Sequence, residues 1–199
     1  GTHSVAYQEV TDSDLARRIA QEAGLRADVD ATTEVYEHVL QNNQSHMAFL
    51  SERAQRIGYE FYVEDRTLFF RRPASRGDAL TLEWGRALRS FRLRQTLAEQ
   101  VDEVFVKGWD PKSRQAITGH ATRGRAAPET GESQAGAQIA SSVFGHARRL
   151  VVNRPVTSQA EADSLAQALC DEISGAFIEA EGLCYGQPEL RAGKSVRLT

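Results

Sequence analysis

The sequence is poor in the residues that build disulfide frameworks and metal sites. Its 199 residues include two cysteines and five histidines. Cys170 and Cys184 are not part of a CxxC motif, and no histidine lies close to either of them in sequence. Two such thiols are typical of reduced, partly buried cysteines, so we expect neither a disulfide framework nor a zinc site.

Long apolar runs and an excess of one charge are also lacking. No apolar run approaches the roughly 20 residues that a membrane-spanning helix needs, and the chain does not open with a signal peptide. The formal net charge is −3, which favours neither a nucleic acid nor an anionic membrane as a partner. We therefore expect a soluble protein with no membrane association.

Methionine is almost absent as well. The one methionine is Met47, so Gly1 is not an unprocessed translation start. Residues 194–199 alternate in polarity like a strand and stop without a terminal tail. We expect an internal fragment of a longer polypeptide, whose other parts carry part of the function.

The remaining composition is ordinary for a globular protein, with 41% hydrophobic and 26% charged residues. At 199 residues, the chain is long enough for one large domain or two small ones. Residues 73–78 are rich in structure breakers, and the patterns on their two sides differ. The sequence therefore predicts an α+β protein, with a small α+β domain over residues 1–73 and a β-rich domain over 74–199.

The first domain begins with a clear helix signal. Thr11 can cap a helix whose apolar stripe contains Leu15 and Ile19, and Gly24 is a suitable stop. A strand is predicted next, over residues 35–40.

A second helix is predicted over about 45–57, with Ser45 as its cap and Gly58 as its stop. Its stripe consists of apolar residues at helical spacing: Met47, Leu50, Ala54 and Ile57. Alternating aromatic residues over 59–71 predict a hairpin. We expect the helix to lie across this hairpin, with four side chains buried together: Leu50, Ile57, Phe61 and Val63.

The second domain shows alternating strand patterns around a turn at residues 110–113. The predicted strands cover residues 80–84, 88–97, 101–109, 116–121 and 177–185. A capping-box pattern at Ser158 predicts a helix over about 158–174. Residues 122–142 lack apolar periodicity and are rich in small and polar residues, so we expect a long mobile loop there.

Arginine is the one residue type with a biased distribution. Arg86, Arg89, Arg92 and Arg94 fall within one short span, close to carboxylates that can neutralise them. A basic groove for nucleic acid is one alternative, although the span shows no recognised nucleic-acid-reading module. Because arginine is enriched in interfaces, we predict contacts between subunits for these arginines, with Trp109 as an apolar anchor.

Several segments, taken in order, resemble one protein family. The matching segments are NQS at 43–45, RIGYEFYVED at 56–65, TLEWG at 81–85, EVFVKGWDPKSRQAI at 103–117, RPVTSQAEADSLAQAL at 154–169 and EAEGLCYGQPELRAG at 179–193. In this order they resemble the phage late control gene D proteins and their relatives, the VgrG spike proteins. The resemblance covers nearly all of the chain outside residues 122–142.

The resemblance implies a fold similar to the hub protein of the T-even phage baseplate. There, a small α+β domain accompanies β-barrel-like antiparallel tube domains, and here one long helix would belong to the tube domain. The implied function is structural: a baseplate hub that joins tail tube to spike in a phage tail, a prophage or a type VI secretion-like contractile injection device.

The resemblance also implies partners and a location. The full-length chain would form a homotrimer that contacts a tail tube protein and a spike protein or domain. The implied location is a virion tail or an injection device assembled in the bacterial cytoplasm.

The competing class is a tail-associated cell-wall hydrolase. Glu179 and Glu181 share one face of a predicted strand, and paired carboxylates can hydrolyse glycosides. Two glutamates on one face of an amphipathic strand are more often a solvated surface. The histidines are scattered singly, without a metal-ligand spacing. We therefore predict a non-enzymatic protein with no catalytic residue, cofactor or metal, and keep a nucleic-acid-binding module as the third alternative.

Overall fold

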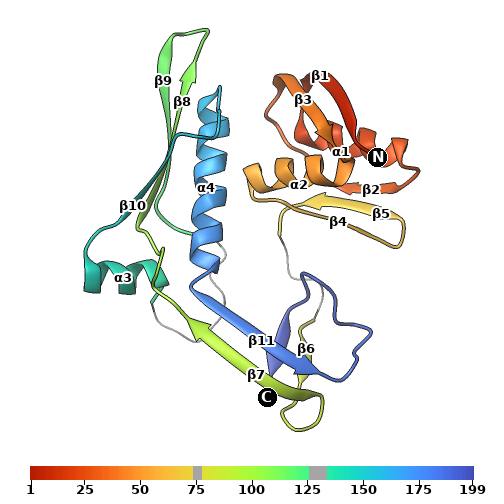
Figure 1. The fold of residues 1–199 in the computed structure, drawn as a ribbon, viewed down its shortest axis with the longest axis vertical. Helices are drawn as coiled ribbons and strands as arrows, with labels where there is room; N and C mark the ends of the chain where they lie inside the picture. The colour runs from red at the N-terminus through yellow and green to blue at the C-terminus, as the bar shows by residue number, and fades with distance from the viewer. Residues whose placement is uncertain (74–77, 126–133) are drawn as a thin grey trace.

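The computed structural model describes residues 1–73, 78–125 and 134–199, and it mixes helices and strands as predicted (Figure 1). The helices are α1 (Asp12–Glu22), α2 (His46–Ile57), α3 (Gly136–Phe144) and α4 (Gln159–Gly175). The strands are β1 (His3–Val10), β2 (Arg26–Val29), β3 (Tyr36–Gln44), β4 (Glu60–Glu64), β5 (Thr67–Arg71), β6 (Leu80–Leu82), β7 (Leu88–Gln95), β8 (Glu103–Asp110), β9 (Gln115–Ala121), β10 (Arg148–Val151), β11 (Ile178–Cys184) and β12 (Val196–Leu198). None of the helices in the described ranges is both long and apolar enough to cross a membrane.

Two small sheets and two helices make up the N-terminal unit, defined here as residues 1–73. β1 and β3 pair antiparallel. β2, β5 and β4 form a second sheet in that order, with β2 parallel and β4 antiparallel to the central strand β5. α1 contacts β2 and β5, whereas α2 contacts β3 and β4, so the two helices connect both sheets.

The ends of α1 follow from the sequence as predicted. Thr11 Oγ1 accepts a hydrogen bond from the backbone N–H of Asp14, and the Asp14 carboxylate accepts one from the backbone N–H of Thr11. This reciprocal pair satisfies two N–H groups that the first turn would otherwise leave without partners. Leu15 and Ile19 are buried on the predicted stripe, and Gly24 follows the helix at a φ of 66°.

The ends of α2 are also as predicted. Ser45 Oγ accepts from the backbone N–H of Ala48 at 3.1 Å, and Gly58 forms a left-handed C-cap at a φ of 68°. The apolar stripe, however, is rotated from the predicted one. Met47 is 53% exposed, whereas Phe49 is 2% exposed and lies in the core.

The hairpin β4–β5 turns at two residues with positive φ, Asp65 and Arg66, as a tight hairpin of right-handed twist requires. Of the four side chains predicted to share a core, Leu50 is fully buried, but Ile57 and Phe61 are only partly buried, and Val63 is 40% exposed.

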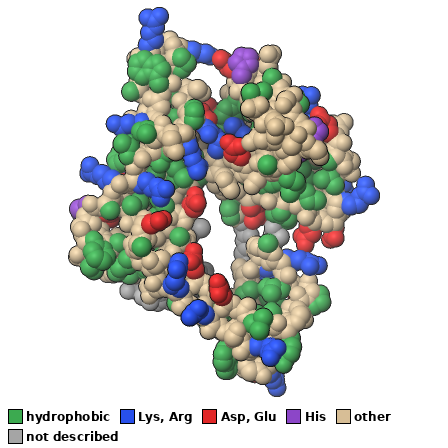
Figure 2. Space-filling view, in the orientation of Figure 1, with side chains coloured by type: hydrophobic (Ala, Val, Ile, Leu, Met, Phe, Trp, Pro, Cys, Tyr) green, Lys and Arg blue, Asp and Glu red, His purple; other side chains and the backbone are tan. Residues whose placement is uncertain are grey.

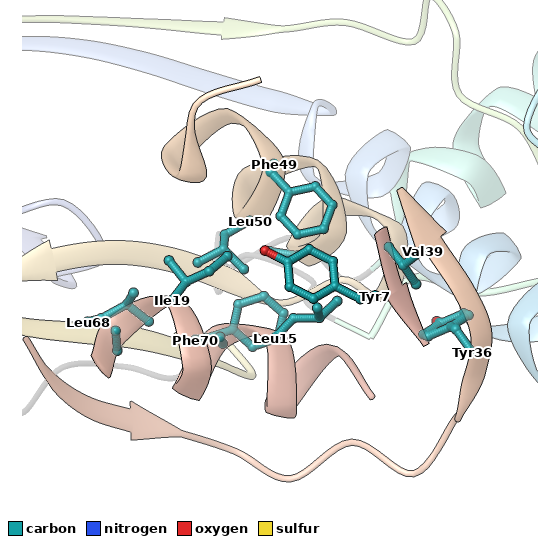
Figure 3. Close-up of a cluster of buried hydrophobic side chains, with 12 residues drawn as sticks. Tyr7, Leu15, Ile19, Tyr36, Val39, Phe49, Leu50, Leu68 and Phe70 are labelled. Carbon is teal, nitrogen blue, oxygen red and sulfur yellow. The ribbon is translucent and has the colours of Figure 1, made fainter. Parts of the chain in front are cut away.

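The predicted strand phase of the hairpin, with Phe61 and Val63 on one face, is nevertheless confirmed. Val63 lies opposite Leu68, and Phe61 lies opposite Phe70. β5 is the central strand, so Leu68 and Phe70 are covered, whereas β4 is an edge strand and leaves Val63 open to solvent. Figure 3 shows Leu68, Phe70 and Leu50 within the resulting core.

The C-terminal unit, residues 78–125 and 134–199, contains a three-stranded sheet covered by one long helix. β8 is the central strand, with β10 parallel and β9 antiparallel to it. α4 contacts β8 and β9, and its buried stripe contains the residues Ala162, Leu165, Ala166, Leu169 and Ile173.

Both the helix and its cap are as predicted. Ser158 Oγ accepts from the backbone N–H of Glu161 at 3.0 Å. Gly119 on β9 lets the strand approach the helix closely, because a Cβ added there would lie 2.1 Å from the carbonyl oxygen of Ala162. Any side chain at position 119 would therefore separate β9 from α4.

The remaining strands do not close a barrel. β7 and β11 form a two-stranded antiparallel ribbon, and β6 and β12 form a parallel pair. A closed barrel requires every strand to have two hydrogen-bonded neighbours. Within the described ranges only β5 and β8 have two. The expected barrel-like antiparallel domain is therefore corrected to separate small sheets, two of which contain parallel pairs.

The predicted mobile loop over residues 122–142 is partly wrong. Residues 126–133 of it lie outside the described residues, as do residues 74–77 of the predicted domain boundary. α3 occupies residues 136–144. Its helical start is supported by the side chain of Gln138, which accepts from the backbone N–H of Ala135 at 3.2 Å. Gly136 and Ala140 are buried and Ile139 is partly buried, so the first turns of α3 pack against the rest of the unit.

Candidate assembly surfaces

The β7–β11 ribbon has one charged face. Its register places Arg94 opposite Glu179 and Arg92 opposite Glu181. A guanidinium nitrogen of Arg94 lies 3.0 Å from a carboxylate oxygen of Glu179, with both side chains more than half exposed. Oppositely charged residues directly across a strand pair stabilise the pairing by a few tenths of a kcal/mol up to about 1 kcal/mol. Arg92 and Arg94 therefore each lie opposite a glutamate of the same chain.

The other face of the ribbon is apolar. Leu93 lies opposite Ala180, and Phe91 lies opposite Gly182. Phe91 and Leu93 therefore lie on the face opposite to that of Arg92 and Arg94. Leu93 is 55% exposed and Phe91 40% exposed, because the β6–β12 pair covers only part of this face. A groove of about 400 Å³ lies between the ribbon and that pair, lined by apolar side chains that include Phe91.

Arg86 and Arg89 lie where the chain enters β7. Arg86 forms an exposed ion pair with Glu83 at 3.1 Å, and the guanidinium of Arg89 lies 5.3 Å from the centroid of the Tyr185 ring. The four predicted interface arginines are therefore all near the ribbon, but each faces a different neighbour. They do not form the continuous basic strip that a nucleic-acid groove would need.

Trp109 lies elsewhere, near the tip of the β8–β9 hairpin, which projects beyond the end of α4 (Figure 1). It is 56% exposed, on the sheet face that points away from α4. The same face carries Phe105 and His120, whose rings stack at a centroid distance of 4.4 Å. Trp109 therefore does not belong to the core, and the structure separates it from the arginines with which we grouped it.

A further apolar cluster was not found from the sequence. Large exposed side chains gather at the end of α3 and along β10: Val143, Phe144, Leu150 and Val152. Figure 2 shows apolar side chains over the part of the molecule that α3 forms. Contiguous exposed apolar side chains of this kind mark interaction sites. No local pattern could have identified them, because their exposure depends on which side chains the tertiary packing of α3 and β10 leaves in contact with solvent.

The glutamate, histidine and cysteine side chains considered for chemistry have different surroundings. Glu179 is engaged by Arg94 on an open ribbon rather than in a cleft. His3 and His46 stack at 4.0 Å, but within the described ranges no three His, Cys, Asp or Glu residues are placed to hold a metal ion. Cys170 and Cys184 are unpaired, and burial raises the pKa of the Cys170 thiol.

Comparison with known proteins adds a family and a fold. The model of one protein family, described as the Alg8 N-terminal domain, matches residues 1–199. This description differs from the late control gene D and VgrG family that the motifs resemble. No curated protein matches the sequence.

Solved structures of phage tail proteins share the fold. The 43 kDa tail protein of prophage MuSo2 from Shewanella oneidensis superposes with a TM-score of 0.65 at 15% identity, covering 98% of this chain and 57% of that one. A tail protein from Neisseria meningitidis MC58 gives a TM-score of 0.60 at 13% identity, covering 100% of this chain and 59% of that one. The chain thus spans less than three fifths of the length of either protein, and at these identities the likeness shows the fold alone.

Proposed function

The chain belongs to the Alg8 N-terminal domain family, and we propose that it is a structural component of a phage tail or of a related contractile injection device. The observation that carries this proposal is the shared fold. Nearly the whole chain superposes on two tail proteins, one of them from a prophage. An entire arrangement of small sheets shared over that length is more specific than any one of the sequence motifs.

More finely, we assign it the role of a baseplate hub similar to the late control gene D and VgrG proteins. The support for this finer role is the ordered set of motifs, from NQS at 43–45 to EAEGLCYGQPELRAG at 179–193. On this proposal the complete polypeptide is a homotrimer, assembled in the bacterial cytoplasm, that joins a tail tube protein to a spike protein or domain.

The ribbon suits such an assembly role because its strand edges can form further hydrogen bonds and its two faces can contact a neighbouring subunit. Within the described ranges β7 and β11 hydrogen-bond only to each other, so each presents one edge to the surroundings. Unpaired strand edges favour pairing with another chain. The apolar face with Phe91 and Leu93 can contribute buried area, and the charges on the other face can set orientation more than affinity.

A charge swap tests this role without breaking the ribbon. Exchanging the partners in R94E/E179R keeps opposite charges across the strand pair but reverses the pattern that a neighbouring subunit would meet. We expect the complete gene product carrying this swap to lose its trimer in multi-angle light scattering, while its circular dichroism stays unchanged.

The matched control is R18E/E22R, which swaps an exposed ion pair of 3.1 Å on α1 in the N-terminal unit. It should leave the trimer intact. A normal trimer with R94E/E179R would remove these residues from the interface, and a strictly monomeric unmutated protein at high concentration would contradict the hub role itself.

A further inference from the structure

The two hydrophobic core clusters of the described residues share no residue. One lies entirely in the N-terminal unit, between Tyr7 and Phe70, and the other lies entirely in the C-terminal unit, between Val104 and Ile173. Each unit therefore has its own core. The free energy that holds the two units in one orientation must come from the contact between them rather than from a shared core.

That contact is centred on α2 and α4. At its apolar point Gly58 approaches Ala168, and a Cβ added to the glycine would lie 3.4 Å from the alanine Cβ. Clefts border the contact on both sides. One of about 270 Å³ is lined by residues that include Arg53 and Arg56, and one of about 500 Å³ is lined by residues that include Gly58 and Ala168. The apolar part of the contact is consequently narrow.

A buried polar cluster adds to the contact, beside two more exposed ion pairs across the boundary, Lys112 with Glu37 and Arg191 with Glu64. Arg56 at the end of α2 reaches across the boundary, and its Nη2 donates to Glu161 Oε1 at 2.6 Å and to the carbonyl oxygen of Pro155 at 2.7 Å. The side chains of Arg56 and Glu161 are 15% and 8% exposed. Nearby, Ser158 Oγ donates to Glu34 Oε1 at 2.5 Å, so the start of α4 is bound to the N-terminal unit by two separate side chains, Arg56 and Glu34.

Arg53, one turn earlier on α2, forms its hydrogen bond and its ring contact within the N-terminal unit. Its Nε donates to Asp12 Oδ1 at 2.5 Å, and its guanidinium lies 4.2 Å from the centroid of the Tyr36 ring. Burial and the neighbouring Asp12 carboxylate raise the pKa of Tyr36. Arg53 thus ties α2 to its own unit, whereas Arg56 ties α2 to the other.

The polar cluster fixes the geometry of the contact but contributes little net free energy to its stability. A buried ion pair recovers its desolvation cost only when its remaining donors are also satisfied. Arg56 Nε is buried and has no hydrogen-bond partner among the described residues. Removing either Arg56 or Glu161 leaves the other as an uncompensated buried charge, so the contact is weakened whichever partner is changed, although the Ser158–Glu34 hydrogen bond does not depend on either.

We propose that Arg56 and Glu161 form a releasable latch between two separately folded units, which holds the N-terminal unit in one of two orientations relative to α4. With the latch closed, the sheets of the N-terminal unit stand at a set angle to the β7–β11 ribbon. With the latch broken, both units stay folded and the N-terminal unit moves away from α4 as one body, carrying α2 with it. This device goes beyond the assembly role, because it concerns the shape of a single chain.

The test compares distances between the units in three variants. Spin labels at Gln21 on α1 and Thr118 on β9, both exposed, are introduced as cysteines in a C184S background, and pulsed electron resonance reports their separation. We expect one narrow distance for the unmutated latch. In Arg56→Gln and in Glu161→Gln, a second and longer distance should rise at least tenfold in population.

The matched control is Arg18→Gln, which removes the same charge from an exposed ion pair within one unit. It should keep the single narrow distance. Circular dichroism and thermal melting of each variant check that both cores remain folded. A single narrow distance in both latch variants would overturn the proposal. Loss of folded structure in the mild Glu161→Gln variant would overturn it equally, since the units would then not be separately stable.

Discussion

Replacing Leu50 by alanine tests the core of the N-terminal unit most sharply. Leu50 is 0% exposed and lies on α2, facing the α1 residues Leu15 and Ile19 and the β5 residue Phe70 (Figure 3). The substitution removes three carbon atoms and leaves a cavity that the surrounding side chains fill only in part. Leucine-to-alanine changes at such sites cost about 2–5 kcal/mol.

The size of the melting shift depends on whether the units unfold together. A cost of about 3 kcal/mol lowers the melting temperature by about 12–24 °C if a unit of this small size unfolds alone, but by about 6–12 °C if the whole chain unfolds as one. Because the two apolar clusters are separate, we expect the larger shift, confined to one of two calorimetric transitions.

Calorimetry measures the shift in melting temperature, and urea denaturation measures the change in the free energy of unfolding. The matched control is Leu40→Ala on β3, where the leucine is 62% exposed, and it should change stability by less than about 0.5 kcal/mol. Melting of Leu50→Ala at the unmutated temperature, or an equal cost for Leu40→Ala, would refute the assigned core.

Two further outcomes follow from local geometry. Gly119→Ala should destabilise the C-terminal unit by about 1–3 kcal/mol in urea denaturation, since its Cβ would meet the backbone of Ala162. The control Gly186→Ala should be close to neutral, because no atom lies within 4 Å of a Cβ added there. Equal costs for the two variants would contradict the close approach of β9 to α4. The hydrogen bond from the backbone N–H of Ala147 lowers the pKa of Asp102 below its ordinary value, so this contact stabilises the fold above about pH 4 and is lost as pH falls through the lower, folded-state pKa. The urea midpoint of the unmutated protein should therefore fall more steeply between pH 5 and pH 3 than that of Asp102→Asn, and identical slopes would argue against the contact.

Helix ends were the most predictable part of the fold. Thr11, Ser45 and Ser158 each cap the helix that the sequence assigns to them, because a cap is a contact between residues only a few positions apart. Strand phase was predictable for the same reason, as the pairing of Phe61 with Phe70 shows.

What depended on distant parts of the chain was not predictable. Val63 has the right phase but sits on an edge strand, and that edge position is set by the pairing of β5 with β2. β1, β2 and β10 have no strong local pattern and are strands because of their partners, which lie far away in sequence. Closure of a barrel depends on how all the strands pair, so the pattern of a single strand does not reveal it.

The candidate surfaces show the same division. The arginine cluster was visible in the sequence, but its pairing with Glu179 and Glu181 required the register of β7 and β11. Arg56 and Glu161 are 105 positions apart. The sequence showed Glu161 only as the last position of a capping pattern, and nothing local indicated that it binds an arginine of the other unit.

The role in a tail is tested most directly by deleting the gene from its host and imaging the particles by electron microscopy. We predict that complete tails or injection devices are absent, that tube and spike proteins accumulate unassembled, and that the intact gene supplied in trans restores assembly. Complete and active particles in the deletion strain would contradict the proposed structural role.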